Sequence, residues 1–263
     1  MDLLSEHGYR QDGRKPNQIR NINCRLGVYS QADGSAYLEQ GNTKVLAAVY
    51  GPHEAKQRSR ILEDQCLINC QYSMATFSTS ERKYRPRGDR KSTELTRHLE
   101  KTFNSAVLTT MYPRSQIDIF CEVLQSDGGN LAACINAASL ALVDAGVPMR
   151  GIVSAAICGA TDGQPCIDLN AAEESANIPR LTPCIDLNAA EESANIPRLT
   201  VATLPGGDDD LLLLELDHRV HHDQLEAIID AAVKGAAQVH ACLQTAIRKH
   251  VSEVATCLQW ENS

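Results

Sequence analysis

Apolar and polar positions alternate along the first third of the chain. From Ile22 to Phe77, segments rich in β-branched and aromatic residues are separated by glycine, asparagine or charged residues, which is typical of successive strands. The segments are INCRLGVYSQ, SAYLEQG, TKVLAAVYG and LINCQYSMATF. The pattern predicts a β-sheet.

The spacing of apolar residues then changes to that of helices. Apolar residues recur every four positions from Leu95 to Val107, which predicts an amphipathic helix over about residues 92–110. The segment SQIDIFCEVLQSD has the period of two that marks a strand. The alanine-rich run over 131–143 predicts a buried helix that ends at the DAGVP turn.

A second set of elements follows the same order. GIVSAAICGAT and LLLLELD predict strands, and apolar positions between Leu225 and Val251 trace a long amphipathic helix. Strands followed by helices, twice over, indicate an α+β fold with two halves of βαβ type. We place the first half at residues 1–155, the second at 156–254 and a tail at 255–263.

An exact repeat lies inside the second half. Residues 165–182, PCIDLNAAEESANIPRLT, recur unchanged as residues 183–200. Two such short copies do not make a solenoid, and their perfect identity indicates a recent duplication or an error in the assembled sequence. Because either CIDLN segment fits the same strand position, every residue assigned here has two alternatives.

Composition limits the function classes. At 263 residues, 43% of them hydrophobic, the chain can bury a sizeable core as one domain without disulfides. Its ten cysteines include no CxxC pair. No run of 18 apolar residues and no secretory leader is visible, so we expect a soluble intracellular protein without a membrane partner. A net charge of -8 argues that any nucleic-acid binding comes from a local patch.

One segment provides such a patch. Six cations fall within ten residues, with only Asp89 opposing them. The alternative is a solvated charged loop. We predict that this basic segment contacts RNA; its cations are Arg82, Lys83, Arg85, Arg87, Arg90 and Lys91.

Five strings in order carry a family resemblance: QDGRK, ADGSAYLEQGNTKVLAAVYGP, CQYSMATFS, SQIDIFCEVLQSDGG and INAASLALVDAGVPM. Together they resemble the ribonuclease PH family, and within it the ring subunits of the eukaryotic RNA exosome. The resemblance implies the ribonuclease PH fold, which is like domain 2 of ribosomal protein S5. It also implies paralogous subunits in a heterohexameric ring, cap subunits of S1/KH type, a hydrolytic exonuclease, and RNA passing through a central channel. The implied location is the nucleus, including the nucleolus, and the cytoplasm.

The resemblance also implies where phosphorolytic chemistry would lie. Active relatives carry GGTR after the predicted strand, and the Thr and Arg contact phosphate at the start of a helix. Here the sequence is Gly128, Gly129, Asn130, Leu131. Leu131 supplies neither charge nor donor, so the arginine that would grip phosphate is missing.

The family's acidic pair is altered as well. Its two positions, six residues apart, correspond to Glu174 and Arg180, or to Glu192 and Arg198 in the second copy. The reversed charge leaves one carboxylate where two would hold a divalent ion. A basic position before a helix glutamate survives as Lys91.

We therefore expect an exosome ring subunit that guides RNA 3′ ends for processing and degradation without catalysis of its own, metal or cofactor. One alternative is an active phosphate-dependent 3′-to-5′ exoribonuclease whose site a partner completes. Another is a stand-alone transfer-RNA-trimming homohexamer, which the missing residues disfavour. We discount a histidine cluster as a metal site because metal ligands usually share one face and are held by further hydrogen-bonding residues: His218, His221 and His222.

Overall fold

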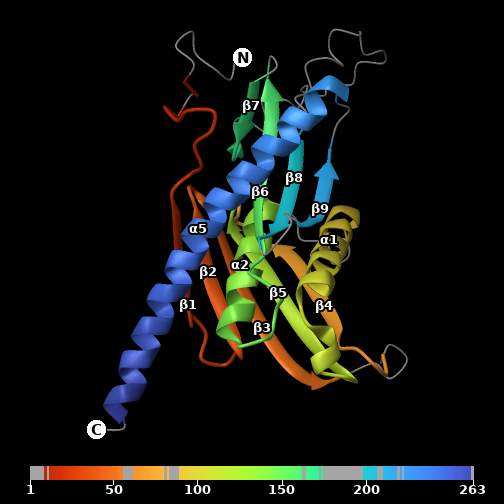
Figure 1. Ribbon diagram of the computed structural model, residues 1–263, viewed down its shortest axis with the longest axis vertical. Helices are drawn as coiled ribbons and strands as arrows, with labels where there is room; N and C mark the ends of the chain where they lie inside the picture. Colours follow the sequence, from red (N-terminus) through yellow and green to blue (C-terminus); the bar gives the residue numbers. More distant parts are fainter. Residues whose placement is uncertain are drawn as a thin grey trace.

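The computed structural model describes residues 9–10, 12–55, 62–79, 82, 89–161, 164–171, 173, 198–205, 210–217, 220 and 222–261 (Figure 1). In these residues the chain forms two sheets and three long helices, which confirms the α+β class. The elements of the first half are β1 (Ile22–Leu26), β2 (Gly34–Gln40), β3 (Thr43–Glu54), β4 (Leu67–Met74), α1 (Arg90–Ala106), β5 (Ser115–Gln125) and α2 (Asn130–Asp144). A 3₁₀ turn, Thr109–Met111, follows α1.

The first sheet has the strand order β1-β2-β3-β5-β4. All pairs are antiparallel except β4 and β5, which run parallel because α1 makes the crossover between them. The predicted apolar stripe of α1 is real, since Leu99 and Phe103 are fully buried. The predicted strand over 67–77 was too long, because β4 ends at Met74 and a turn follows.

The second half contains β6 (Ser154–Thr161), β7 (Gln164–Ile167), β8 (Arg198–Leu204), β9 (Asp210–Leu216) and α5 (His222–Glu261). Its sheet has the order β7-β6-β8-β9 and is antiparallel throughout the described residues. Among the described strands, the one parallel pair, β4 with β5, therefore lies in the first half. Helix α5 runs diagonally across this sheet, and its C-terminal end extends beyond the body of the molecule (Figure 1).

Helix α2 joins the two halves. It packs on strands of both sheets, and Leu131 to Leu142 are all buried, as the alanine-rich run predicts. Asn136 accepts a 2.7 Å hydrogen bond from the N–H of Ala155 and donates a 3.0 Å bond to its carbonyl. These bonds satisfy the backbone of β6 where β7 does not reach it.

The repeat contributes to two different strands. Pro165–Ile167 of the first copy lie in β7, whereas Arg198, Leu199 and Thr200 of the second copy begin β8. Both strands pair with β6, for example Ile167 with Cys158 and Leu199 with the same residue. The structure therefore assigns β7 to the first copy.

Candidate functional site

The loop between β5 and α2 is a tight turn. Gly128 and Gly129 have φ of 79° and 65°, in the left-handed region that glycine tolerates best. A Cβ at Gly128 would lie 2.7 Å from the backbone of Asn170, so this turn packs directly on the start of the repeat. Asn130 begins α2 directly after this turn, so the first N–H groups of α2 lack partners within the helix, the feature by which helix N-termini bind anions.

Arg20 holds this turn from inside. Its guanidinium donates to the carbonyls of Asp127 at 2.6 Å and Gly128 at 3.3 Å, and to the hydroxyl of Thr43 at 3.2 Å. It also donates to Oδ1 of Asp168 at 2.7 Å, and both side chains are almost completely buried. Burial alone would raise the pKa of Asp168, but the hydrogen bond and charge of Arg20 hold that pKa below its ordinary value.

A second buried ion pair clamps the segment that follows β7. Arg10 donates through Nε to Glu173 at 2.7 Å and through Nη2 to the carbonyl of Asp168 at 2.9 Å. Asn170 and Glu173 bond to each other's backbone N–H, both at 2.9 Å. The residues before β1 thus fix the first copy of the repeat against the Gly128–Gly129 turn. Sequence reasoning missed this network because its partners are 148 to 163 residues apart.

The two residues at the positions where active relatives contact phosphate, Asn130 and Leu131, carry no positive charge. Asn130 begins α2, and its Nδ2 donates to the hydroxyl of Ser126 at 2.8 Å. Leu131 is only 6% exposed and belongs to the main core. Neither side chain presents a positive charge to the turn.

The predicted acidic pair is only partly described. Arg198 lies at the start of β8, and its Nε is 3.6 Å from Oδ2 of Asp217. The structure therefore places Arg198 in the second sheet, in an ion pair with Asp217, the residue directly after β9. The remaining positions of the pair lie outside the described residues: Glu174, Arg180 and Glu192.

Half of the basic segment is described. Arg82, Arg90 and Lys91 are exposed, whereas Lys83, Arg85 and Arg87 lie outside the described residues. Arg90 and Lys91 begin α1, whose first turn contains no acidic residue. Cations at a helix N-terminus oppose the helix dipole, at a cost of about 0.3–1 kcal/mol each. Their position therefore does not serve the stability of α1.

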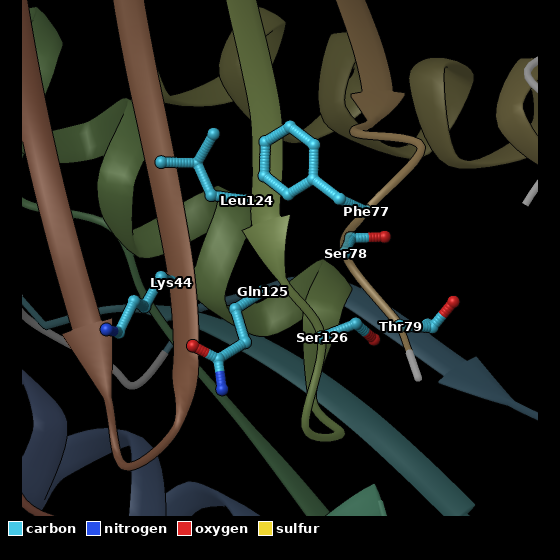
Figure 2. Close-up of a pocket in the computed structure, with 7 residues that line it drawn as sticks. All are labelled: Lys44, Phe77, Ser78, Thr79, Leu124, Gln125 and Ser126. Atoms are coloured by element: carbon cyan, nitrogen blue, oxygen red, sulfur yellow. The ribbon is translucent and has the colours of Figure 1, made fainter. Parts of the chain in front are cut away.

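An open cleft of about 470 Å³ lies at the ends of β4 and β5 (Figure 2). Phe77 and Leu124 form an apolar wall, and Lys44 and Gln125 lie on the neighbouring strands β3 and β5. Ser126 connects the cleft to Asn130 through their shared hydrogen bond. Sequence reasoning used CQYSMATFS as a family string and assigned its residues up to Phe77 to a strand, so it missed this cleft. Its lining residues are Lys44, Phe77, Ser78, Thr79, Leu124, Gln125 and Ser126.

Among the described residues, no group of three His, Cys, Asp or Glu side chains is arranged to hold a metal ion. Of the discounted histidines, His222 begins α5, and His218 and His221 lie outside the described residues. Within the described part of the chain, no helix is both long and apolar enough to cross a membrane.

Comparisons with known proteins define the family to which this chain belongs. The model of the 3′ exoribonuclease family, domain 1 (RNase_PH), matches residues 18–148. A crystal structure of rice (Oryza sativa) Rrp46 superposes with a TM-score of 0.75 at 25% identity, covering 91% of this chain and all of that one. The chain belongs to the ribonuclease PH family of 3′ exoribonucleases.

Within this family, the chain is similar to exosome complex component RRP41. The Homo sapiens protein of that name is 50% identical over 259 residues, which are 98% of each chain. A Caenorhabditis briggsae relative with the same designation is 54% identical over 258 residues, covering 98% of this chain and 99% of that protein.

Proposed function

We propose that this chain is a ring subunit of an RNA exosome that guides RNA 3′ ends to a separate hydrolytic nuclease and does not itself cleave RNA. Relatives named as exosome complex components match nearly the whole chain, which supports the assembly. Membership in a 3′ exoribonuclease family supports RNA as the bound polymer. The proposed location is the nucleus, with the nucleolus, and the cytoplasm.

The buried Leu131 carries the non-catalytic part of the proposal. Phosphorolysis needs cations or N–H donors that hold inorganic phosphate against the negative charge of RNA. In the family pattern an arginine follows the turn, but here a core leucine takes that position at 6% exposure. The amide of Asn130 is engaged by Ser126. The N–H groups of α2 alone lack the charge of the arginine fork.

The exposed face of β9 supports assembly with paralogous subunits. Over the described residues, β9 pairs only with β8, so its other edge is open. Leu211, Leu214 and Leu216 are 46%, 50% and 41% exposed. An open edge strand with exposed leucines is a surface that proteins normally cover. We infer that a ring neighbour covers it; cap subunits of S1/KH type and the hydrolytic nuclease complete the proposed assembly.

The basic segment supplies the proposed RNA contact, and crosslinking tests it. RNA with a photoreactive 3′ end should crosslink to the peptide that contains Arg82, Arg90 and Lys91 when the ring is reconstituted with its partners. The control is Arg114, an exposed cation after the 3₁₀ turn, whose peptide should stay unlabelled. Labelling of both peptides alike would contradict a guided path.

The alternative is an active phosphorolytic enzyme whose site a partner's arginine completes. The first turn of α2 still offers the N–H groups that bind an anion, which favours keeping this alternative. The two proposals differ in one product, because only phosphorolysis releases nucleoside diphosphates in the presence of inorganic phosphate.

A further inference from the structure

Phe77 is exposed to an unusual degree. Its side chain is 72% exposed, more than any other large hydrophobic residue among those described. The ring lies at the cleft rather than over the core, so it contributes little to folding (Figure 2). An exposed aromatic ring at a concave site is a typical contact for a ligand with a flat face.

The turn that carries Phe77 is firmly attached. The N–H of Ala75 donates to the carbonyl of Val123, and the N–H of Ser78 closes the turn on Ala75 at 3.0 Å. The N–H of Ser126 then donates to the carbonyl of Ser78 at 2.8 Å. Ala75 and Ser78 are buried at 5% and 3% exposure. Because the backbone turn that carries Phe77 is held by these hydrogen bonds, the ring loses little conformational entropy when a ligand stacks on it.

The other walls of the cleft suit a nucleotide. Lys44 lies opposite Gln125 in the pairing of β3 with β5, and its ammonium is 3.9 Å from a carboxylate oxygen of Glu39. Glu39 also accepts a bond from Tyr37, so Lys44 is not its only partner. With its side chain 39% exposed, Lys44 can offer charge to a phosphate at the rim. Thr79 adds a polar side chain on the side of Phe77, whereas the hydroxyl of Ser78 is buried.

One described cation of the basic segment, Arg82, lies close to the cleft along the chain. Arg82 is exposed and follows Thr79 by three residues, so its Cα lies within about 11 Å of Thr79. A polynucleotide that leaves the cleft on this side can therefore place its next phosphate near the positive charge of Arg82. A peptide would use the apolar wall but would not need the cations Lys44 and Arg82, so the surroundings favour a nucleic acid strand.

We propose that the cleft binds one nucleotide of single-stranded RNA, with its base stacked on Phe77 and its phosphate beside Lys44. This inference rests on the proposed function and deepens it. It assigns base stacking to a residue outside the altered phosphate turn, so RNA can be held here although inorganic phosphate is not.

The test compares variants in the reconstituted ring, using fluorescence anisotropy with an oligouridine labelled at its 5′ end. Phe77→Ala should weaken binding roughly fivefold or more, the lower limit for the loss of one stacked base, and Phe77→Trp should retain it. Lys44→Ala should reduce the slope of log affinity against log salt by about 0.7. Met111→Ala, at a 62% exposed residue on the 3₁₀ turn, is the control and should change nothing.

The outcomes separate this inference from the proposed function. If the wild-type ring binds RNA and Phe77→Ala binds it equally well, the cleft is not a nucleotide site and only this inference fails. If Phe77→Ala instead prevents assembly of the ring, a partner's polypeptide occupies the cleft, which also overturns it. If the wild-type ring binds no RNA at all, the proposed function fails as well. Thermal unfolding of each variant verifies that the chain is folded.

Discussion

Replacing Asp168 by asparagine should destabilise the fold strongly. Asp168 is fully buried and accepts hydrogen bonds from the backbone and guanidinium of Arg20 and from Gln40, at 2.7 to 3.0 Å. Removing one partner of a buried ion pair costs about 3–5 kcal/mol, because the other charge is left uncompensated. Arg20 keeps its bonds to the carbonyls of Asp127 and Gly128, so we expect the lower value, about 3 kcal/mol. At about 2–4 °C per kcal/mol, the melting temperature should fall by about 6–12 °C.

The repeat provides a matched control. Asp186 occupies the position of Asp168 in the second copy, with identical neighbours for the length of the repeat. Urea and thermal unfolding of the purified chain, after its intact mass has confirmed the repeat, should show a large effect for Asp168→Asn and none for Asp186→Asn. Wild-type stability of Asp168→Asn would refute the reasoning. If each single variant is stable and the double variant is not, the two copies exchange in β7, contrary to the assignment of β7 to the first copy.

The loss of stability caused by Asp168→Asn should also depend on pH. The folded state holds the pKa of Asp168 below its unfolded value, mainly through Arg20, although burial opposes this. The stabilisation is therefore present above the ordinary carboxyl range near pH 4 and disappears as the pH falls through the lowered folded pKa. The difference between wild type and Asp168→Asn should be complete at neutral pH and shrink in acid. An unchanged difference at acid pH would contradict the ion pair as its cause.

Three further predictions concern other parts of the molecule. Replacing the three described cations of the basic segment by alanine should lower the salt slope of RNA binding by the ring by up to about 2, because each phosphate contact on a single strand adds about 0.7; equal slopes would exclude them as contacts. Asn136→Ala should cost about 2–5 kcal/mol in urea unfolding, because the buried N–H and carbonyl of Ala155 both lose their partner, whereas Asn104→Ala, on the exposed face of α1, should not. Burial raises the pKa of Glu215, with nearby carboxylates adding to the rise and His98 opposing it. The folded state therefore binds this proton more tightly than the unfolded state, and wild-type stability falls as the pH rises through the folded pKa. Glu215→Gln should therefore gain stability relative to wild type as the pH rises from the ordinary glutamate range to the raised folded pKa, and a constant difference would contradict this.

Local periodicity predicted most elements of the fold. The four-residue spacing of Leu95, Leu99 and Phe103 indicates α1 directly, since a helix needs only an apolar stripe. The alternation in SQIDIFCEVLQ indicates β5 for the same kind of reason. These signals lie within one turn or one pleat of the chain, so the sequence alone contains them. The end of β4 was misplaced because the turn that stops it depends on bonds to Val123 and Ser126 of a distant segment.

The site was less accessible to such reasoning. The loss of the family arginine at Leu131 is visible in the sequence, but its burial in the core is not. Arg20 and Asp168 meet across 148 residues, and no local pattern identifies which of the many charged residues are paired inside. The sequence pattern placed Phe77 at the end of a predicted strand, where an aromatic residue is common. Only the turn beyond Met74 shows that its ring faces the cleft.

Incubation of body-labelled single-stranded RNA with the reconstituted ring, with and without inorganic phosphate, tests the central claim most directly. The RNA should remain intact in both conditions while bound, and no labelled nucleoside diphosphate should appear on thin-layer chromatography. Phosphate-dependent release of nucleoside diphosphate that Lys91→Ala abolishes would contradict the account and show that this chain retains a phosphorolytic site.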